Sequence, residues 1–531
     1  MTRPRGSLPV GFRVRVGSDV RVHDEGRTLV GGSPLRVMRL REPAPALSRG
    51  AELEVVDRTS GVVAERLLAA NLAAPVLGVA PVAELTVVVP IRDRAERLDR
   101  LLHCLAGLPV VVVDDASRDP FAVAAVASRH GARLVTLTAN VGPAGARNAG
   151  LAEVRTPYVA FVDSDVVVTA ATLSGLAGHF ADPWVAAVGP RVRAVARDPA
   201  RPGGPRRFER WDFEGLSLDL GAAPALVRPW SKVGWLPSAC LLVRVTDLAP
   251  RNGGGFEPGR RVGEDVDLVW RLIQRDRHVR YDPAYEAQHD SRGTWRTWLG
   301  RKAFYGSGGA WLAQRHGDWM APAVLSPVPT IGAIALLGQR RWSLPCVLGA
   351  IALVRLRLGR TLPDTPDRAR LATALTAEVS TSTLRQGSHL LLRHWWPGAA
   401  VAALVSRRAR RAVVAALVWD LLDHRNLRPA KAPEAFVARR LDDLAYGAGL
   451  WWGALQARSA RVLVPRVTGL RGARRPDRSV GSDRAPAPSP AGPRPWLAVT
   501  PRRARLRTAL DLRLRKGRQG RHRHLASRWG R

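Results

Sequence analysis

Four short apolar runs, separated by segments long enough for a helix, constrain the fold of this chain more than any other feature. The runs are residues 85–89, 110–113, 134–137 and 158–162, and residues 121–129 are typical of an intervening helix. Runs this short indicate strands buried on both faces, in βαβ units on a parallel sheet. Because such strands end at one edge, where ligands bind, the residues after each run are the candidates for a site.

Two carboxylates follow the fourth run directly. Asp163 and Asp165 flank a single serine, and two negative charges on one turn repel each other unless a cation lies between them. A divalent, oxygen-binding ion is the predicted neutraliser, and it would bind a diphosphate and stabilise the charge on the leaving nucleotide. The alternative is an ordinary acidic loop, because such a triplet alone is weakly specific.

A second acidic pair, Asp114 and Asp115, follows the second run. Carboxylates at this edge can accept hydrogen bonds from a base or from ribose hydroxyls. A helix cap that uses Ser117 or Asp119 is the alternative, and it is compatible with a ligand role. After the third run, residues 140–148 read Asn-Val-Gly-Pro-Ala-Gly-Ala-Arg-Asn, where glycine lets the backbone approach a ligand and Arg147 can reach a base or phosphate.

A third acidic group begins an amphipathic helix later in the chain. Glu264, Asp265 and Asp267 stand in its first turn, and a carboxylate there could take the proton from an acceptor hydroxyl. Asp265 is the predicted base, with Glu264 as its neighbour, whereas Asp267 complements the helix dipole. The alternative is that all three residues only cap the helix.

These motifs occur in an order that resembles family 2 glycosyltransferases of the GT-A fold, over residues 85–309. The ordered set is Val88-Val89-Pro90, Asp114-Asp115-Ala116-Ser117, Gly-Pro-Ala-Gly-Ala-Arg-Asn at 142–148, Asp163-x-Asp165 and Glu264-Asp265. The resemblance implies inverting transfer of a sugar from a UDP- or GDP-sugar, with Mg²⁺ or Mn²⁺, by direct displacement and a single base. The synthase motif Gln-x-x-Arg-Trp is not matched, since Gln339-Arg340-Arg341-Trp342 is one residue too short, so extrusion of a long polymer is not expected.

The resemblance also implies which residues act. Asp265 would be the catalytic base. The implied donor-binding residues are Pro90, Asp114, Asp115, Arg147, Asp163 and Glu264, and the implied metal ligands are Asp163, Asp165 and His289. A neutral imidazole can ligate Mn²⁺, although a lone histidine is more often structural. The basic residues Arg292, Arg296, Arg301 and Lys302 follow and could hold donor phosphates.

At a finer level the chain is similar to the branch of this family that works in mycofactocin biosynthesis. The similarity is carried by residues 29–36, Tyr305-Gly306-Ser307-Gly308 with Arg315-His316, and residues 442–449 with Trp451 and Gly453. It implies successive addition of β-1,4-linked glucose from UDP-glucose to a peptide-derived redox cofactor precursor. It also implies that roughly the first 80 residues form a winged-helix-like module that recognises a peptide.

The predicted fold class is α/β, with four parts. Residues 1–83 are predicted to form a small α+β module, with strand alternation at 11–30 and a helix at 61–72. Residues 84–320 are predicted to form the GT-A domain, and residues 321–465 an apolar and basic helical region that associates with membrane. Residues 466–531 are predicted to form a basic, disordered tail. The apolar blocks 321–338 and 344–354 contain prolines or fall short of the roughly 20 residues of a spanning helix. Shallow or hairpin insertion is therefore expected, with buried amphipathic helices as the alternative.

The net charge of +37 is almost entirely arginine. Codon bias or attraction to an acidic surface could each produce it, and a lipid or cell-wall glycan acceptor is the alternative substrate. A nucleic-acid partner is not expected, because acidic pairs at strand ends would repel phosphates. Cys104, Cys240 and Cys346 form no ligand pattern, and no signal peptide is evident, so the enzyme is expected at the cytoplasmic face of the cell membrane.

Overall fold

The computed structural model describes residues 8–33, 35–40, 47–78, 84–195, 209, 217–250, 254–291, 294–362, 367–427 and 433–468. The chain divides into two compact units, Met1–Ser489 and Pro490–Arg531, and every described residue belongs to the first. The boundaries predicted at 83/84 and 320/321 therefore fall inside one unit. Most of the predicted basic tail, residues 469–531, lies outside the described residues.

The N-terminal module is rich in short strands. One sheet has the order β5 (Glu52–Glu54), β1 (Arg13–Val16), β6 (Ala73–Val76), and the other contains β2 (Arg21–His23), β3 (Thr28–Gly31) and β4 (Arg36–Arg39). Alternation in β1 buries Val14 and Val16 and exposes the intervening arginines, as the period of two predicts. Helix α1 (Arg58–Ala69) packs its leucines on this core. Within residues 8–78 as described, α1 is the one α-helix, so the winged-helix likeness is not confirmed.

A nine-stranded mixed sheet forms the centre of the part predicted as the GT-A domain, residues 84–320, called the catalytic part below. Its parallel half has the order β10 (Tyr158–Val162), β7 (Leu85–Ile91), β8 (Val110–Asp114), β9 (Arg133–Thr136), which confirms the four predicted strands. The other half contains β14 (Cys240–Arg244), β12 (Val185–Val195), β15 (His278–Asp290), β11 (Val166–Val167) and β13 (Ala225–Leu226). Strand β14 runs antiparallel to β10 and β12, whereas β12 and β15 pair parallel, so the predicted parallel sheet is instead a mixed sheet.

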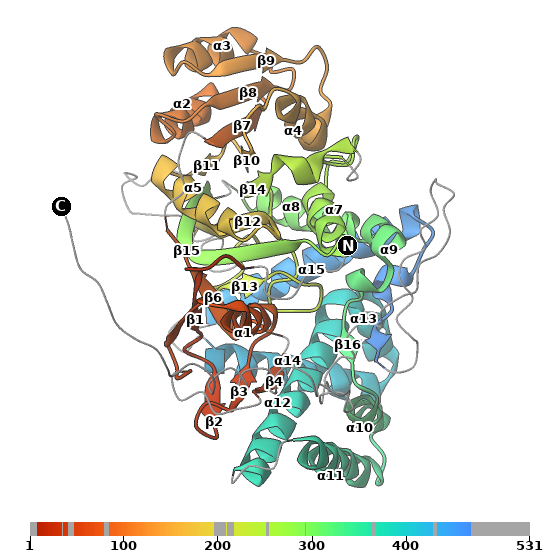
Figure 1. Ribbon diagram of the computed structural model, residues 1–531. Helices are drawn as coiled ribbons and strands as arrows, with labels where there is room; N and C mark the ends of the chain where they lie inside the picture. The colour runs from red at the N-terminus through yellow and green to blue at the C-terminus, as the bar shows by residue number, and fades with distance from the viewer. Residues whose placement is uncertain are drawn as a thin grey trace, which may run out of the picture. The chain divides into compact units, whose positions relative to one another are not determined.

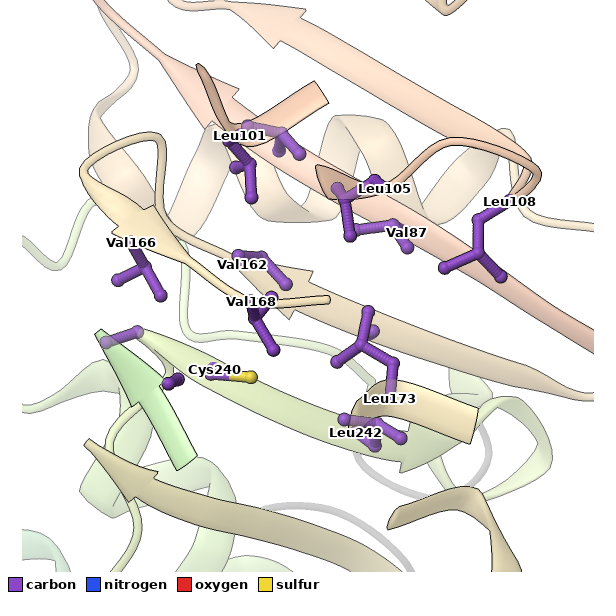
Figure 2. Packing of buried hydrophobic residues seen from close by; sticks show 14 of the residues in the cluster. Val87, Leu101, Leu105, Leu108, Val162, Val166, Val168, Leu173, Cys240 and Leu242 are labelled. Carbon is purple, nitrogen blue, oxygen red and sulfur yellow. The ribbon is translucent and has the colours of Figure 1, made fainter. Parts of the chain in front are cut away.

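Helices cover both faces of this sheet (Figure 1). On one face α2 (Ala95–Cys104), α3 (Pro120–Arg129) and α5 (Ala170–Ala177) pack on the cluster drawn in Figure 2, which includes Val87, Leu101, Leu173 and Leu242. On the other face lie α4 (Gly142–Ala152), α7 (Glu264–Gln274) and α9 (Gly309–His316). Burial on both faces explains the uninterrupted valine runs of β7 and β8, and it holds the carboxyl ends of the parallel strands in place.

Two helices far apart in sequence pack closely against each other. Helix α8 (Trp295–Ser307) lies against α15 (Pro433–Gln456). A Cβ atom added to Gly449 would lie 1.8 Å from the Ala303 carbonyl oxygen, and one added to Gly453 would lie 2.3 Å from that of Ser307. Only glycine permits this approach, which gives a physical reason for the glycines that mark residues 447–453.

Helices α10 (Pro327–Gly338) and α11 (Ser343–Thr361) form a hairpin, and α12 (Arg368–His389), α13 (Trp396–Val405) and α14 (Arg407–Leu427) complete the helical region. Gln339 ends α10 in a left-handed conformation, so the Gln339–Trp342 stretch is a hairpin turn. Among the described residues, none of the helices combines the length and apolarity needed to cross a bilayer. Strand β17 (Arg466–Val467) pairs with β16 (Val324–Leu325), so the first residues of the predicted tail instead belong to a two-stranded sheet.

Candidate active site

A buried arginine joins the two acidic motifs that the sequence places about 100 residues apart. Arg147, in α4, donates to Asp163 Oδ1 at 2.6 Å and to Glu264 Oε1 at 3.0 Å. Its side chain is only 3% exposed. Burial opposes the charge of Arg147, but the attraction of Asp163 and then Glu264 is stronger and raises its pKa. The strand end at 163 and the start of α7 therefore form one site.

Asp265 stands in the first turn of α7, directly after Glu264. Its Oδ1 accepts from the Val266 amide at 2.8 Å and its Oδ2 from the Ser238 amide at 3.3 Å. Burial, and then the negative charge of Glu264, raise the pKa of Asp265 to about 7. A carboxyl with this pKa accepts a proton efficiently near neutral pH, so the predicted base has suitable chemistry.

The structure brings Asp165 and His289 together. Strand β11 pairs with β15 so that Val166 is opposite His289, and His289 Nε2 lies 3.6 Å from Asp165 Oδ1. The imidazole is buried, and its Nδ1 has no hydrogen-bond partner among the described residues. These two side chains could share a divalent cation. In the described part of the chain no cluster of three His, Cys, Asp or Glu side chains forms a metal site by itself.

Arg97 is a neighbour of this pair that the sequence analysis missed. Its guanidinium lies 3.5 Å from Asp165 Oδ2 and also 3.5 Å from Asp290 Oδ2. Arg97 is buried on the same face of α2 as Leu98, Leu101 and Leu102. A charged residue within the apolar stripe of a helix was the available signal, because such a charge is rarely buried without a partner.

Asp114 and Asp115 occupy the end of β8, as predicted, and differ in their contacts. The Asp115 carboxylate accepts from the amides of Val141 at 2.7 Å and Gly142 at 2.9 Å, and from the Asn140 side chain at 2.9 Å. It thereby holds the loop that starts α4. Asp114 Oδ1 accepts from the Ser117 amide at 2.9 Å, while its buried Oδ2 has no partner in the described part of the chain. The helix cap weighed from sequence is made by Asp119, which accepts from the Ala122 amide at 3.0 Å at the start of α3, and the ligand role of Asp114 and Asp115 stays a prediction.

The other residues named in the sequence analysis have separate positions and contacts. Asn140 accepts from Arg261 at 2.7 Å, which connects the Asp115 loop to the residues before α7. Pro90, near the end of β7, pairs with Val113 of β8. Arg301 is within electrostatic reach of Asp163 and Asp165, whereas Arg292 lies outside the described residues.

Lys302 does not fit the predicted phosphate role. Its ammonium group donates to Ser217 Oγ at 2.6 Å and forms an ion pair with Asp442 Oδ1 at 2.6 Å. Since Asp442 belongs to α15, the pair joins α15 to α8. Asp442, the first residue of the 442–449 motif, therefore stabilises the packing of these two helices.

Asp267 does more than complement the helix dipole. Its side chain is fully buried, and Oδ1 accepts from His316 Nε2 at 2.8 Å and pairs with Arg315 at 2.7 Å. Oδ2 accepts from Arg271 at 2.8 Å. The buried carboxylate therefore anchors α9 to α7, which explains the Arg315-His316 dipeptide. The sequence contained both partners but no sign that they meet.

Comparison with known proteins identifies the family of this chain. The sequence model described as "Glycosyl transferase family 2" matches residues 86–227. A protein named "Pre-mycofactocin glycosyltransferase", from two strains of Mycobacterium tuberculosis, is 38% identical over 477 residues, which cover 87% of this chain and 98% of that protein. This chain belongs to glycosyl transferase family 2. The resemblance inferred from the ordered motifs is confirmed.

Other similar proteins match a smaller part of the chain. An uncharacterised glycosyltransferase of Mycobacterium bovis is 32% identical over 226 residues, covering 35% of this chain and 97% of that protein. Among solved structures, a mannosyltransferase of Pyrobaculum calidifontis in complex with GDP-Man and Mn²⁺ is 21% identical, with a TM-score of 0.34 over 67% of this chain and 90% of that chain. A TM-score this low carries no argument about function.

Proposed function

We propose that this family 2 glycosyltransferase is an inverting, metal-dependent enzyme that transfers glucose from UDP-glucose to a peptide-derived redox cofactor precursor in mycofactocin biosynthesis, forming β-1,4-linked glucose chains. The observation that carries the chemical part is Arg147, which joins Asp163 to the helix start that bears Asp265. The acceptor class is supported by the 38% identity to a protein named "Pre-mycofactocin glycosyltransferase".

The proposed reaction is a single displacement. Asp265 takes the proton of an acceptor hydroxyl, the oxygen attacks the anomeric carbon from the face opposite the leaving group, and the bond to the nucleoside diphosphate breaks. Because a single attack occurs from the face opposite the leaving group, the configuration of the anomeric carbon inverts. Arg147 stays protonated and keeps Asp163 and Glu264 at the donor end, while the Ser238 and Val266 amides orient the base.

Asp165 and His289 would hold the divalent ion, with Asp163 beside them. Such an ion supplies positive charge to the leaving diphosphate. The pair fits this role because a carboxylate and a neutral imidazole are ligands of Mn²⁺ and because their nearest atoms are 3.6 Å apart. Arg97 lies 3.5 Å from the same carboxylate and would balance part of its charge. Pro90, Asp114 and Asp115 line the strand ends proposed for the nucleoside.

Product analysis tests this proposal. Full-length enzyme, UDP-glucose, Mn²⁺ and candidate peptide-derived acceptors are incubated, and mass spectrometry should show successive additions of one hexose. We expect Asp265→Asn to bind UDP-glucose normally and to transfer at least about a hundredfold more slowly, the usual contribution of a general base. Asp165→Asn should lose donor binding as well. Normal transfer by either variant would contradict the role given to that residue.

We also propose that the helical region binds the surface of a membrane without crossing it. Large apolar side chains point outward on α11 and α14: Leu344 is 63% exposed, Leu348 57% and Val414 58%. A hollow of about 490 Å³ on α14 is lined by apolar side chains between Arg410 and Leu422. Apolar faces next to arginine are typical of segments that lie in the interface of an anionic bilayer. The cytoplasmic face is proposed because that leaflet carries the acidic lipids.

The same surface favours a second candidate, transfer to a lipid-linked or cell-wall glycan. An enzyme held at a bilayer meets lipid-linked acceptors readily. The two candidates separate in one assay, in which peptide-derived and lipid-linked acceptors compete for radiolabelled glucose. Label found only in the organic phase would replace the first candidate with the second.

A further inference from the structure

One segment, residues 225–239, connects the N-terminal module to the catalytic carboxylates. At its start the side-chain amide of Asn71 pairs with the backbone of Leu226: Oδ1 accepts from the Leu226 amide at 2.5 Å and Nδ2 donates to the Leu226 carbonyl at 3.2 Å. Asn71 follows α1 with a positive φ of 55°, a conformation that asparagine tolerates better than most residues. The end of α1 thus holds β13 as a neighbouring strand would.

A second contact comes from the turn after β3. Ser33 Oγ accepts from the Lys232 amide at 2.9 Å, and the Ser33 carbonyl accepts from Asn71 at 2.9 Å. Gly32 has a φ of 80°, and a Cβ there would lie 2.1 Å from the Ala70 carbonyl oxygen. The turn can therefore reach the end of α1 only with glycine at this position. This geometry explains the Gly-Gly-Ser motif, which the proposed reaction leaves unused.

The other end of the segment touches the active site. Ser238 donates its amide to Asp265 Oδ2 at 3.3 Å, and the Ala239 carbonyl accepts from the Asp163 amide at 3.0 Å. Between the two ends, Trp270 of α7 donates to the Gly234 carbonyl at 2.8 Å. The same fifteen-residue stretch, 225–239, therefore contacts the module, the helix that carries the base, and both catalytic motifs.

The segment is stiff enough to transmit a displacement. Its central turn is closed by a hydrogen bond from the Arg228 amide to the Val233 carbonyl at 3.1 Å. The Ser231 hydroxyl lies 2.8 Å from the Arg228 carbonyl oxygen and 2.7 Å from the Val233 carbonyl oxygen, between which its one proton is shared. Val233 and Leu236 are buried, with 2% and 0% of their surface exposed. A closed turn fixed to a packed core moves as a unit, because few of its torsions can change independently.

We propose that Asn71 and Ser33 are positioning residues for catalysis: they hold residues 225–239 so that the Ser238 amide orients Asp265. The N-terminal module is then a working part of the active site, and anything that binds the module can alter the rate of transfer through this segment. The kinetic part of this inference rests on the proposed function of Asp265, whereas the contact itself does not.

Two variants remove the contacts with little strain. Asn71→Gly keeps the left-handed backbone and deletes the amide, and Ser33→Ala deletes one acceptor. The matched control is Ser60→Ala, which removes a hydroxyl at the other end of α1 whose hydrogen bonds, within the described residues, are with Val56 and Asp57. Ser60→Ala and Asn71→Gly act at opposite ends of α1, but only the test variants remove a contact with Leu226 or Lys232.

Hydrogen exchange followed by mass spectrometry is the first measurement, made on the full chain without donor. Peptides that span residues 226–238 should exchange faster in Asn71→Gly and Ser33→Ala than in wild type, with Ser60→Ala unchanged there. Unchanged exchange in both test variants would overturn the inference. This readout needs no activity, so it separates a failed contact from a failed assignment of function.

Glucosyl transfer is the second measurement. We expect kcat to fall by about threefold to tenfold in the test variants, the value of one or two weakened hydrogen bonds, with KM for UDP-glucose unchanged. Burial and Glu264 raise the pKa of Asp265, whereas Arg147 and the hydrogen bond from the Ser238 amide lower it. A weakened Ser238 contact is therefore expected to raise this pKa. The acid limb of kcat/KM should therefore move to higher pH. A fall in kcat with an unmoved limb would show general loosening and contradict the positioning role.

Discussion

At the scale of single residues, the protonation state of Asp265, the proposed base, sets the expected pH dependence of transfer. Burial and then Glu264 raise the pKa of this carboxyl to about 7. Because only the ionised form accepts a proton, we predict that kcat/KM for the acceptor falls about tenfold per pH unit below pH 7 and is level above it. Initial rates from pH 5 to 9 measure this. A profile that stays level down to pH 5 would exclude Asp265 as the base.

The same shift has a consequence for stability. A carboxyl whose folded pKa is above its unfolded value favours the folded state at low pH, and this contribution is lost as pH rises through about 7. Asp265→Asn carries no charge, so at pH 8 its midpoint in urea should equal or exceed that of wild type, while transfer is lost. At pH 5 the difference should shrink. A large loss of stability at pH 8 would mean that the side chain supports the fold rather than the reaction.

At the scale of elements, glycine sets the distance between α8 and α15. Gly449→Ala would place a methyl group 1.8 Å from the Ala303 carbonyl oxygen, so we predict a loss of about 1–3 kcal/mol in the free energy of unfolding. Gly349→Ala in α11 is the matched control: nothing lies within 4 Å of its Cβ position. The control should gain up to about 1 kcal/mol from helix propensity. Equal effects in urea unfolding would contradict close packing of the two helices.

At the scale of the whole molecule, the exposed apolar side chains of the helical region are the basis of the proposed membrane binding. We predict that the full chain sediments with vesicles containing anionic lipid, and that the double variant Leu344→Gln, Leu348→Gln sediments at least about fivefold less, because each exposed leucine loses roughly 1.5–3 kcal/mol of burial in lipid. Phe121→Gln is the control, since Phe121 is 84% exposed on α3 of the catalytic part. An equal loss in the control, or none in the double variant, would contradict binding through this face.

The sequence by itself determined the parallel strands, the acidic residues at their ends and the acidic first turn of α7 that bears the proposed base. These are local properties: a buried valine run, a carboxylate after it, or a charge in the first turn of a helix can each be recognised within about ten residues. The order of the motifs then sufficed for the family, which the comparisons confirmed.

Only the tertiary structure decided which of these groups meet. Arg147 pairs with Glu264 across 117 residues, His316 with Asp267 across 49, and Asn71 with Leu226 across 155. The strand β14, which lies antiparallel between β10 and β12, and the glycine contacts of α15 depend in the same way on distant partners. A hydrogen bond or a close backbone approach needs both partners in place, and periodicity along one segment contains no information about the other. The sequence therefore determined what chemistry was present, and the packing of the sheet and its helices decided where it converges.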